Sequence, residues 1–109
     1  MLIEFDKMET TVIPYMRGGE KEVSAQMYAD SLGKIMRGTL LPGASIGLHT
    51  HETSSEIIYI LSGTGKVLCD GTYEPLSAGS CHYCPKGHEH SLSNDSEGDL
   101  VFFAVVPEQ

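Results

Sequence analysis

From residue 34 onward, the chain consists of short runs of strand-forming residues separated by turn residues. The runs are Lys34–Leu41, Ser45–Thr50, Glu56–Leu61, Lys66–Cys69, Thr72–Leu76, Ser80–Cys84, His90–Leu92 and Leu100–Val106. Between them lie turn sequences such as Ser62–Gly65 and Asp70-Gly71, which contain the glycines that tight hairpins need. Strands at a spacing of about 8–12 residues, without a sustained helical period, predict an all-β sandwich or barrel. The uninterrupted apolar run Val101–Val106 predicts a strand that is buried on both faces.

The residues before position 34 carry weaker signals. Thr10–Met16 is a candidate short strand interrupted by Pro14, and Glu22–Tyr28 is a candidate edge strand. A chain of 109 residues can bury one core but not two, so we predict a single domain over residues 1–109. Because such N-terminal strands can pair across a subunit boundary, we expect residues 1–33 to contribute to a homodimer.

The charge balance narrows the possible partners. The formal net charge is −8, and a surface this acidic repels phosphate backbones and anionic lipids, so we expect neither nucleic acid nor a membrane surface as a partner. No apolar run has the length of a transmembrane span. The start of the chain, Met1–Lys7, lacks the pattern of a signal peptide, and three cysteines are an odd number that suits a reducing compartment. We therefore expect a cytoplasmic protein.

The stretch from Gly43 to Gly63 contains a pattern of metal-ligating side chains. His49 and His51 are two residues apart, and Glu56 follows five residues later. In an extended chain the period of two places both imidazoles on one face, about 7 Å apart along the strand. A turn rich in Ser and Thr can then return Glu56 on the adjacent strand as an oxygen ligand. A lone His-x-His pair more often belongs to a solvated face, so a further ligand is needed.

A second stretch, Gly79–Asn94, offers that ligand. Pro85 ends a strand, Gly87 permits a tight loop, and His90 begins the next strand. A rigid Pro-x-Gly turn constrains where His90 points, which a third imidazole ligand requires.

The two stretches together resemble the two signature motifs of the cupin superfamily. The first motif matches at Gly43, His49, His51, Glu56 and Gly63, and the second at Gly79, Pro85, Gly87, His90 and Asn94. Every defining position is filled, although Ser80 stands where many cupins have Asp. Only 15 residues (64–78) separate the motifs, as in the small single-domain bacterial cupins. The resemblance covers residues 34–106 and implies an antiparallel β-barrel of the jelly-roll type.

The resemblance also implies the ligands of a metal centre, His49, His51, Glu56 and His90. Three neutral imidazoles and one carboxylate suit one divalent transition metal ion, such as Mn, Fe, Ni, Co, Cu or Zn, better than calcium. Each ligand histidine needs a partner for its second ring nitrogen, and nearby Ser or Thr hydroxyls and backbone carbonyls are the candidates.

Two functional hypotheses follow. The first is an enzyme acting on a small polar metabolite that chelates the metal, because dioxygenases, decarboxylases, isomerases and lyases all occur on similar cupins. The second is a non-catalytic module that binds a small molecule or a metal.

Two further residues are candidates for a catalytic role. His82 lies mid-strand before the ligand loop, where it could face the barrel as a general base or as a partner of a ligand, or lie on the outer face. Arg37 could point inward and pair with a substrate carboxylate, although a solvated arginine is the more common outcome. Alternation alone does not decide the face of either residue.

The remaining side chains of interest favour structural roles. Ile58 and Ile60 share the face of Glu56 and are expected to line the pocket, while Tyr59 faces another packing layer. His88 is expected to be exposed. Cys81 and Cys84 lie three residues apart on a strand, so their sulfurs point to opposite faces and cannot readily meet. We expect at least two of the three cysteines to be buried as small hydrophobic residues.

Overall fold

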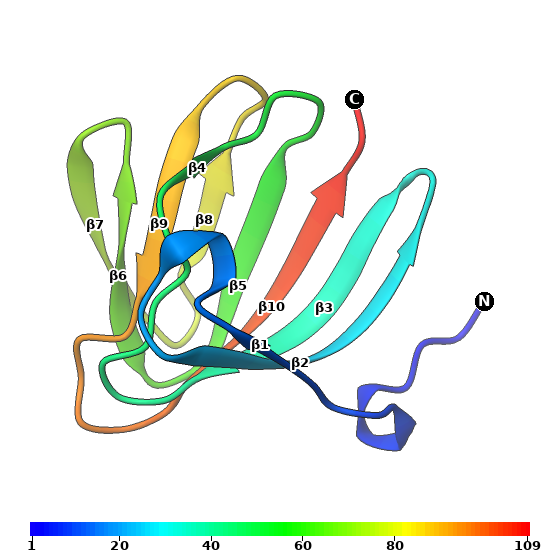
Figure 1. The fold of residues 1–109 in the computed structure, drawn as a ribbon, viewed down its shortest axis with the longest axis horizontal. Helices are drawn as coiled ribbons and strands as arrows, with labels where there is room; N and C mark the ends of the chain where they lie inside the picture. Colours follow the sequence, from blue (N-terminus) through cyan, green and yellow to red (C-terminus); the bar gives the residue numbers. More distant parts are fainter.

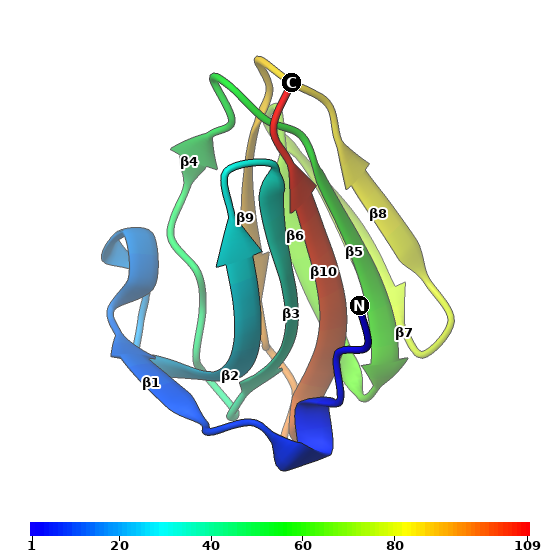
Figure 2. The same ribbon diagram turned by 90° about the vertical axis from the view of Figure 1, so that its right-hand side faces the viewer.

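The computed structural model describes all 109 residues as two antiparallel sheets that face each other (Figures 1 and 2). In order across the larger sheet lie β1 (Thr11–Pro14), β2 (Glu22–Asp30), β3 (Gly33–Leu40), β10 (Leu100–Pro107), β5 (Glu56–Ser62) and β8 (Cys81–Cys84). In order across the smaller sheet lie β4 (His49–Thr50), β9 (Glu89–Ser93), β6 (Thr64–Cys69) and β7 (Thr72–Ser77). The all-β architecture predicted from the turn spacing is confirmed.

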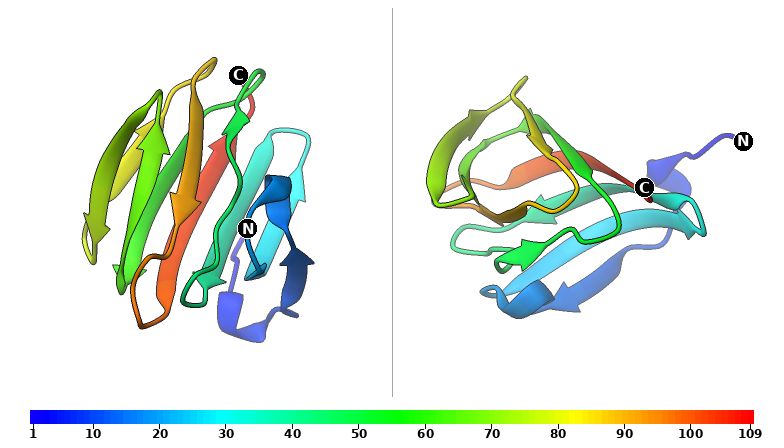
Figure 3. Two further views of the ribbon diagram at one scale, coloured as in Figure 1. Left: turned by 60° about the vertical axis from the view of Figure 1, so that its left-hand side comes forward. Right: turned by 90° about the horizontal axis from the view of Figure 1, so that it is seen from above.

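The only helices are two single 3₁₀ turns in the N-terminal region. They are η1 (Phe5–Lys7) and η2 (Met16–Gly18). Neither is long and apolar enough to cross a membrane. The view from above in Figure 3 shows the two sheets curving around a common interior, with η2 close to one end of β2.

The core fills the space between the sheets. Alternation along β5 turns Glu56, Ile58 and Ile60 inward, and Ile58 and Ile60 are almost fully buried. They join a cluster of 14 buried apolar residues. The predicted face is therefore correct, but these two isoleucines pack in the core and do not line the cleft described below.

The outer face of the larger sheet differs from the expectation. Ile57, Tyr59 and Leu61 face outward as predicted, but no second layer of the chain covers them, and they are 37–46% exposed. The prediction that β10 is buried on both faces is also wrong, because its outer face is only partly covered, by Phe5 at Phe103. Its buried side chains, including Phe102, face the smaller sheet, while the alternate ones, including Phe103, are only half-buried. Here a continuous apolar run marks an apolar outer surface.

The N-terminal segment completes the larger sheet within its own chain. β1 pairs antiparallel with β2, which in turn pairs along its length with β3. The pairing that the sequence suggested across a subunit boundary is thus made inside one chain. The expected strand Ser45–Thr50 shrinks to β4 and one isolated bridge at Ser45, because residues between them approach η2 closely. A Cβ on Gly47 would lie 2.0 Å from the carbonyl oxygen of Arg17.

Candidate metal centre

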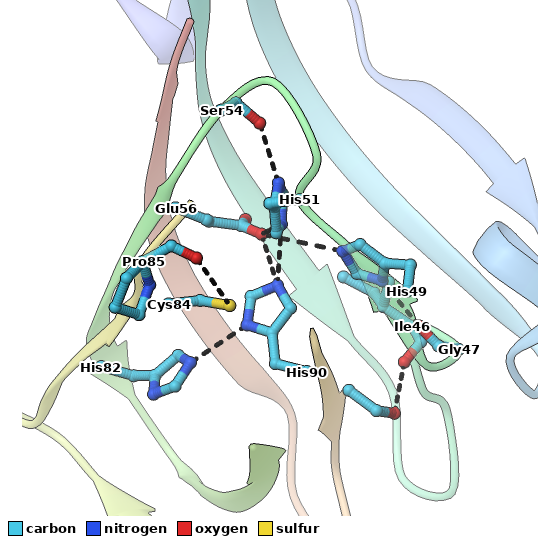
Figure 4. Close-up of polar contacts among 11 residues, drawn as sticks. Ile46, Gly47, His49, His51, Ser54, Glu56, His82, Cys84, Pro85 and His90 are labelled. Carbon is cyan, nitrogen blue, oxygen red and sulfur yellow. Dashed lines mark hydrogen bonds and ion pairs between the residues drawn. The ribbon is translucent and has the colours of Figure 1, made fainter. Parts of the chain in front are cut away.

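Four potential ligands converge between the two sheets (Figure 4). His49 lies in β4, His51 directly follows it, Glu56 begins β5, and His90 lies in β9. One ligand atom from each side chain lies within 4.8 Å of the others. Glu56 Oε1 is 3.0 Å from His51 Nε2, 2.9 Å from His90 Nε2 and 4.0 Å from His49 Nε2.

Backbone pairing brings the two halves of the site together. His49 lies directly opposite His90 in the β4–β9 ladder. The loop before β9 adopts a left-handed conformation at Gly87 (φ 88°), where glycine carries no steric penalty. This loop donates the Gly87 N–H to the carbonyl of His51 and accepts the His51 N–H at the carbonyl of His88. The Pro-x-Gly loop thus aligns His51 with His90.

Every ligand histidine has a partner for its Nδ1 atom, so that its Nε2 atom faces the common centre. His49 Nδ1–H donates to the carbonyl oxygen of Gly47 at 2.7 Å. His51 Nδ1 lies 2.9 Å from Ser54 Oγ, and His90 Nδ1 lies 3.0 Å from His82 Nε2. A backbone carbonyl and a nearby serine are partners of the kinds that the sequence suggested. Such contacts orient a ligand ring and select its tautomer.

The donor set fits a cation. A carbonyl oxygen only accepts, so His49 carries its proton on Nδ1 and presents a lone pair from Nε2. The Nε2 atoms of His51 and His90 are 3.0 Å apart, and the Glu56 carboxylate touches both. Electron-rich atoms packed this closely, with little access to water, repel one another unless a proton or a metal cation lies between them. Three imidazole nitrogens and one carboxylate oxygen suit a divalent transition ion.

The electrostatic environment keeps the site ready for a cation at neutral pH. Burial alone would raise the pKa of Glu56, but hydrogen bonds with His51 and His90 outweigh it and lower that pKa to about 2. Burial lowers the pKa of His49, because an imidazolium is disfavoured away from water. The carboxylate is therefore ionised and His49 is neutral near pH 7.

A cleft of about 460 Å³ gives access to the centre. His49, His51 and Glu56 contribute to its wall, whereas His90 lies beneath them. The cleft has two basic side chains in its lining, Arg17 and Lys34. Its acidic lining residues, apart from Glu56, are Asp30, Glu52 and Glu108.

Arg37 does not reach this cleft, which corrects the suggestion that it could face a substrate. The inward positions of β3 are Met36, Gly38 and Leu40, so alternation turns Arg37 outward. Its guanidinium pairs with Asp6 at 2.8 Å and lies over the ring of Phe5. Arg37 therefore fastens η1 to the outer face of the sheet.

His82 takes the inward one of its two possible orientations. It is 2% exposed and contacts His90, not the cleft. Its other ring nitrogen contacts Glu74 of β7 at 2.8 Å. Glu74 has no signature in the sequence, because the approach of β7 to β8 depends on how the two sheets face each other. His88 is exposed, as expected, and its ring contacts Asp70.

The cysteines differ from the expectation in burial. Cys81 is exposed, Cys84 is buried and Cys69 is half-buried, so only one of the three is a core residue. Cys81 and Cys84 do lie on opposite faces of β8, as predicted. Cys69 and Cys84, however, meet His82 across the sheets, with one potential ligand atom of each within 4.8 Å of the others. This group has no signature in the sequence because it joins three strands.

The fold and the convergent site are those of a cupin. The family model for the cupin domain matches residues 36–106, and the chain belongs to this family. The resemblance seen in the two motifs is thereby confirmed.

Individual relatives extend the likeness over the whole chain. An oxalate-binding protein of Thermotoga maritima is 35% identical, and the match covers 97% of this chain and 93% of that protein. A crystal structure of a predicted oxalate decarboxylase from Thermotoga maritima superposes with a TM-score of 0.94 at 33% identity, covering both chains completely. The polyketide cyclase of Streptomyces resistomycificus has the same fold, with a TM-score of 0.81 at 19% identity over 98% of this chain and 78% of the other.

Proposed function

We propose that this cupin holds one divalent transition metal ion through His49, His51, Glu56 and His90, and that it binds a small dicarboxylate of the oxalate class at that ion. The observation that carries the proposal is the convergence of three imidazole Nε2 atoms and one carboxylate at the inner end of an open cleft. When bound, the metal would supply a Lewis acid that chelates and polarises the carboxylate oxygens of the ligand.

The residues around the cleft support an anionic ligand. Arg17 and Lys34 line it, and neither makes an ion pair within the chain. Their charges can offset that of a dicarboxylate, while the metal holds its chelating end. The acidic residues in the lining, such as Glu52, disfavour any ligand whose negative charge exceeds what the metal and the two basic residues offset. A relative of 35% identity that is an oxalate-binding protein agrees with this ligand class.

The test is calorimetric titration of oxalate into protein loaded with Mn²⁺, Co²⁺ or Zn²⁺, beside the same titration into protein stripped by a chelator. We expect saturable binding by the loaded protein only, and weaker binding of acetate, which cannot form the same chelate. Replacing Arg17 by Gln is expected to weaken oxalate binding while metal binding stays unchanged. Equal binding of oxalate by stripped and loaded protein would contradict the proposal.

Decarboxylation of the bound dicarboxylate is the second candidate function. Cleavage of the C–C bond in the oxalate monoanion releases CO₂, and the proton of its carboxyl group is moved to the remaining carbon to give formate. Glu52 and Asp30 line the cleft and are carboxyl groups that can carry this proton. Formate and CO₂ formed by the loaded protein, and lost in Glu52→Gln, would favour an enzyme. Tight oxalate binding without either product would leave the binding module as the function.

We further propose that the protein is a cytoplasmic homodimer. The uncovered side chains Ile57, Tyr59, Leu61 and Tyr83 form an apolar surface on the outer face of β5 and β8. Exposed apolar surfaces of this kind commonly mark contacts between subunits, and a second copy of the chain can cover this one symmetrically. The buried thiol of Cys84 and its unpaired neighbours suit a reducing compartment.

A further inference from the structure

Behind His90, a line of hydrogen bonds runs from the ligand away from the cleft to the surface. His90 Nδ1 is 3.0 Å from His82 Nε2, and His82 Nδ1 is 2.8 Å from Glu74 Oε1. The three residues come from β9, β8 and β7, so the line crosses from the smaller sheet to the larger one and back. Figure 4 shows the ring of His82 beyond that of His90, on the side away from His49.

The direction of these hydrogen bonds follows from the chemistry of the groups. A carboxylate only accepts, so Glu74 requires the proton of His82 on Nδ1. Neutral His82 then has a lone pair on Nε2 and accepts a hydrogen bond from the Nδ1–H of His90. With a metal ion bound, His90 would have no proton on Nε2, the atom that faces Glu56 and His51. The opposite tautomer of His90 would place a proton where a metal ion has to bind.

Burial limits the hydrogen-bond partners that the ring nitrogens of His82 and His90 can have. His82 and His90 are 2% and 1% exposed, so water does not supply alternative partners for their ring nitrogens. At the far end Glu74 is half-exposed, with 48% of its side chain accessible, and its charge can remain solvated. The solvated carboxylate of Glu74 is thus linked to the buried ligand His90 through the imidazole of His82.

We propose that Glu74 and His82 form a positioning pair that holds His90 in the tautomer and orientation that a metal ion requires. This inference rests on the proposed metal centre. Neither residue touches the ion or the cleft, and their effect passes entirely through His90. Removal of partners of this kind commonly lowers metal affinity by about 10–100-fold.

A rival role for His82 is a second metal site with Cys69 and Cys84. That role would require His82 to give up one of its two hydrogen bonds. Burial also raises the pKa of the Cys84 thiol to about 12, so the thiolate that such a site needs is disfavoured. The positioning role uses both nitrogens of His82 as the structure places them.

The experiment measures Zn²⁺ affinity by chelator competition together with the histidine tautomers by ¹H–¹⁵N NMR. In the Zn²⁺-loaded wild type we expect His82 and His90 both to carry their protons on Nδ1. His82→Phe removes the acceptor and is expected to lower the affinity by about 10–100-fold. His82→Gln keeps a carbonyl that can accept a hydrogen bond from His90, so it is expected to restore part of the lost affinity. In Glu74→Ala, the proton of His82 is no longer expected to be confined to Nδ1. Tyr73→Phe, an exposed change next to Glu74 on β7, is the matched control.

The outcomes separate this inference from the proposed function. A wild type that binds no Zn²⁺ would remove the metal centre itself. A wild type that binds Zn²⁺, with His82→Phe and Glu74→Ala binding equally well, would overturn the positioning pair alone. A second bound equivalent of Zn²⁺ that is lost in Cys84→Ala would assign His82 to the rival site. Apo thermal unfolding of each variant identifies any loss of affinity that comes from a failure to fold.

Discussion

At the scale of single residues, the most informative contact is that of Glu56 with two imidazole nitrogens. Glu56 supplies the only negative charge among the four converging side chains, and its pKa is held at about 2. Removing this charge should therefore weaken the binding of a divalent ion more than removing His82, which is only a hydrogen-bond partner of a ligand. We predict that Glu56→Gln, which conserves shape, weakens Zn²⁺ or Co²⁺ binding by more than about 100-fold, the upper range for outer partners.

Chelator competition measures this effect, and Glu108→Gln is the matched control because Glu108 also lines the cleft without belonging to the four. Equal metal affinity in Glu56→Gln and the wild type would show that the carboxylate is not a ligand.

The pH dependence of metal binding follows from the same residues. A metal competes with protons for the imidazoles, so affinity should be constant above the ordinary histidine pKa and should fall as the pH drops below it. Burial lowers the pKa of His49 from 6.5, so this ligand gives way to protons later than a free histidine. Glu56, with its pKa of about 2, stays ionised throughout this range.

A titration of metal affinity between about pH 5 and pH 8 checks the prediction. Affinity that begins to fall well above pH 7, or that is unchanged down to pH 5, would contradict it.

At the scale of elements, β3 and β10 depend on a close fit between Gly38 and Phe102. The two residues are register partners, and a Cβ on Gly38 would lie 2.4 Å from the Phe102 ring. Phe102 is fully buried, so its ring has little room to move. We predict that Gly38→Ala lowers the free energy of unfolding by about 1–3 kcal/mol, the usual cost of overpacking.

A double variant tests the stated cause. Replacing Phe102 by Leu in the Gly38→Ala background should relieve the clash, so the two losses measured by denaturant unfolding should be less than additive. Strict additivity would mean that the ring and the added methyl group do not interact.

Much of the element order was predictable because hairpin turns and period-two alternation are local properties. β5 and the turn at Asp70-Gly71 appear where these signals lie. The region before β4 was not predictable, since contacts with η2 from a distant part of the chain interrupt the expected strand there. Likewise, an apolar run such as Val101–Val106 does not reveal whether anything covers its outer side.

The same distinction applies to the site. The motif spacing identified the four converging residues, including His90, because each is held by a nearby turn. Glu74 and the approach of Cys69 to Cys84 escaped notice, because they depend on contacts between sheets. Which of its two possible orientations Arg37 takes could not be decided from the sequence, because alternation gives two faces without naming the inner one.

At the scale of the whole molecule, the apolar outer face predicts self-association. We expect light scattering at micromolar protein to give twice the chain mass of 11.8 kDa. Tyr59→Glu should yield monomers, because it would place a charge in the contact between the subunits. Tyr73→Glu changes a more exposed tyrosine of the smaller sheet and should leave the dimer intact. A monomeric wild type would contradict the proposal.

The proposed function and the positioning pair both depend on one ion bound by the four converging side chains. X-ray absorption spectroscopy of protein carrying one equivalent of Zn²⁺ or Co²⁺ tests this most directly. The predicted spectrum contains three imidazoles and one carboxylate oxygen with no sulfur, and the bound metal is lost in His90→Ala. Sulfur ligands in the wild type, or an unchanged spectrum in His90→Ala, would contradict the proposed centre.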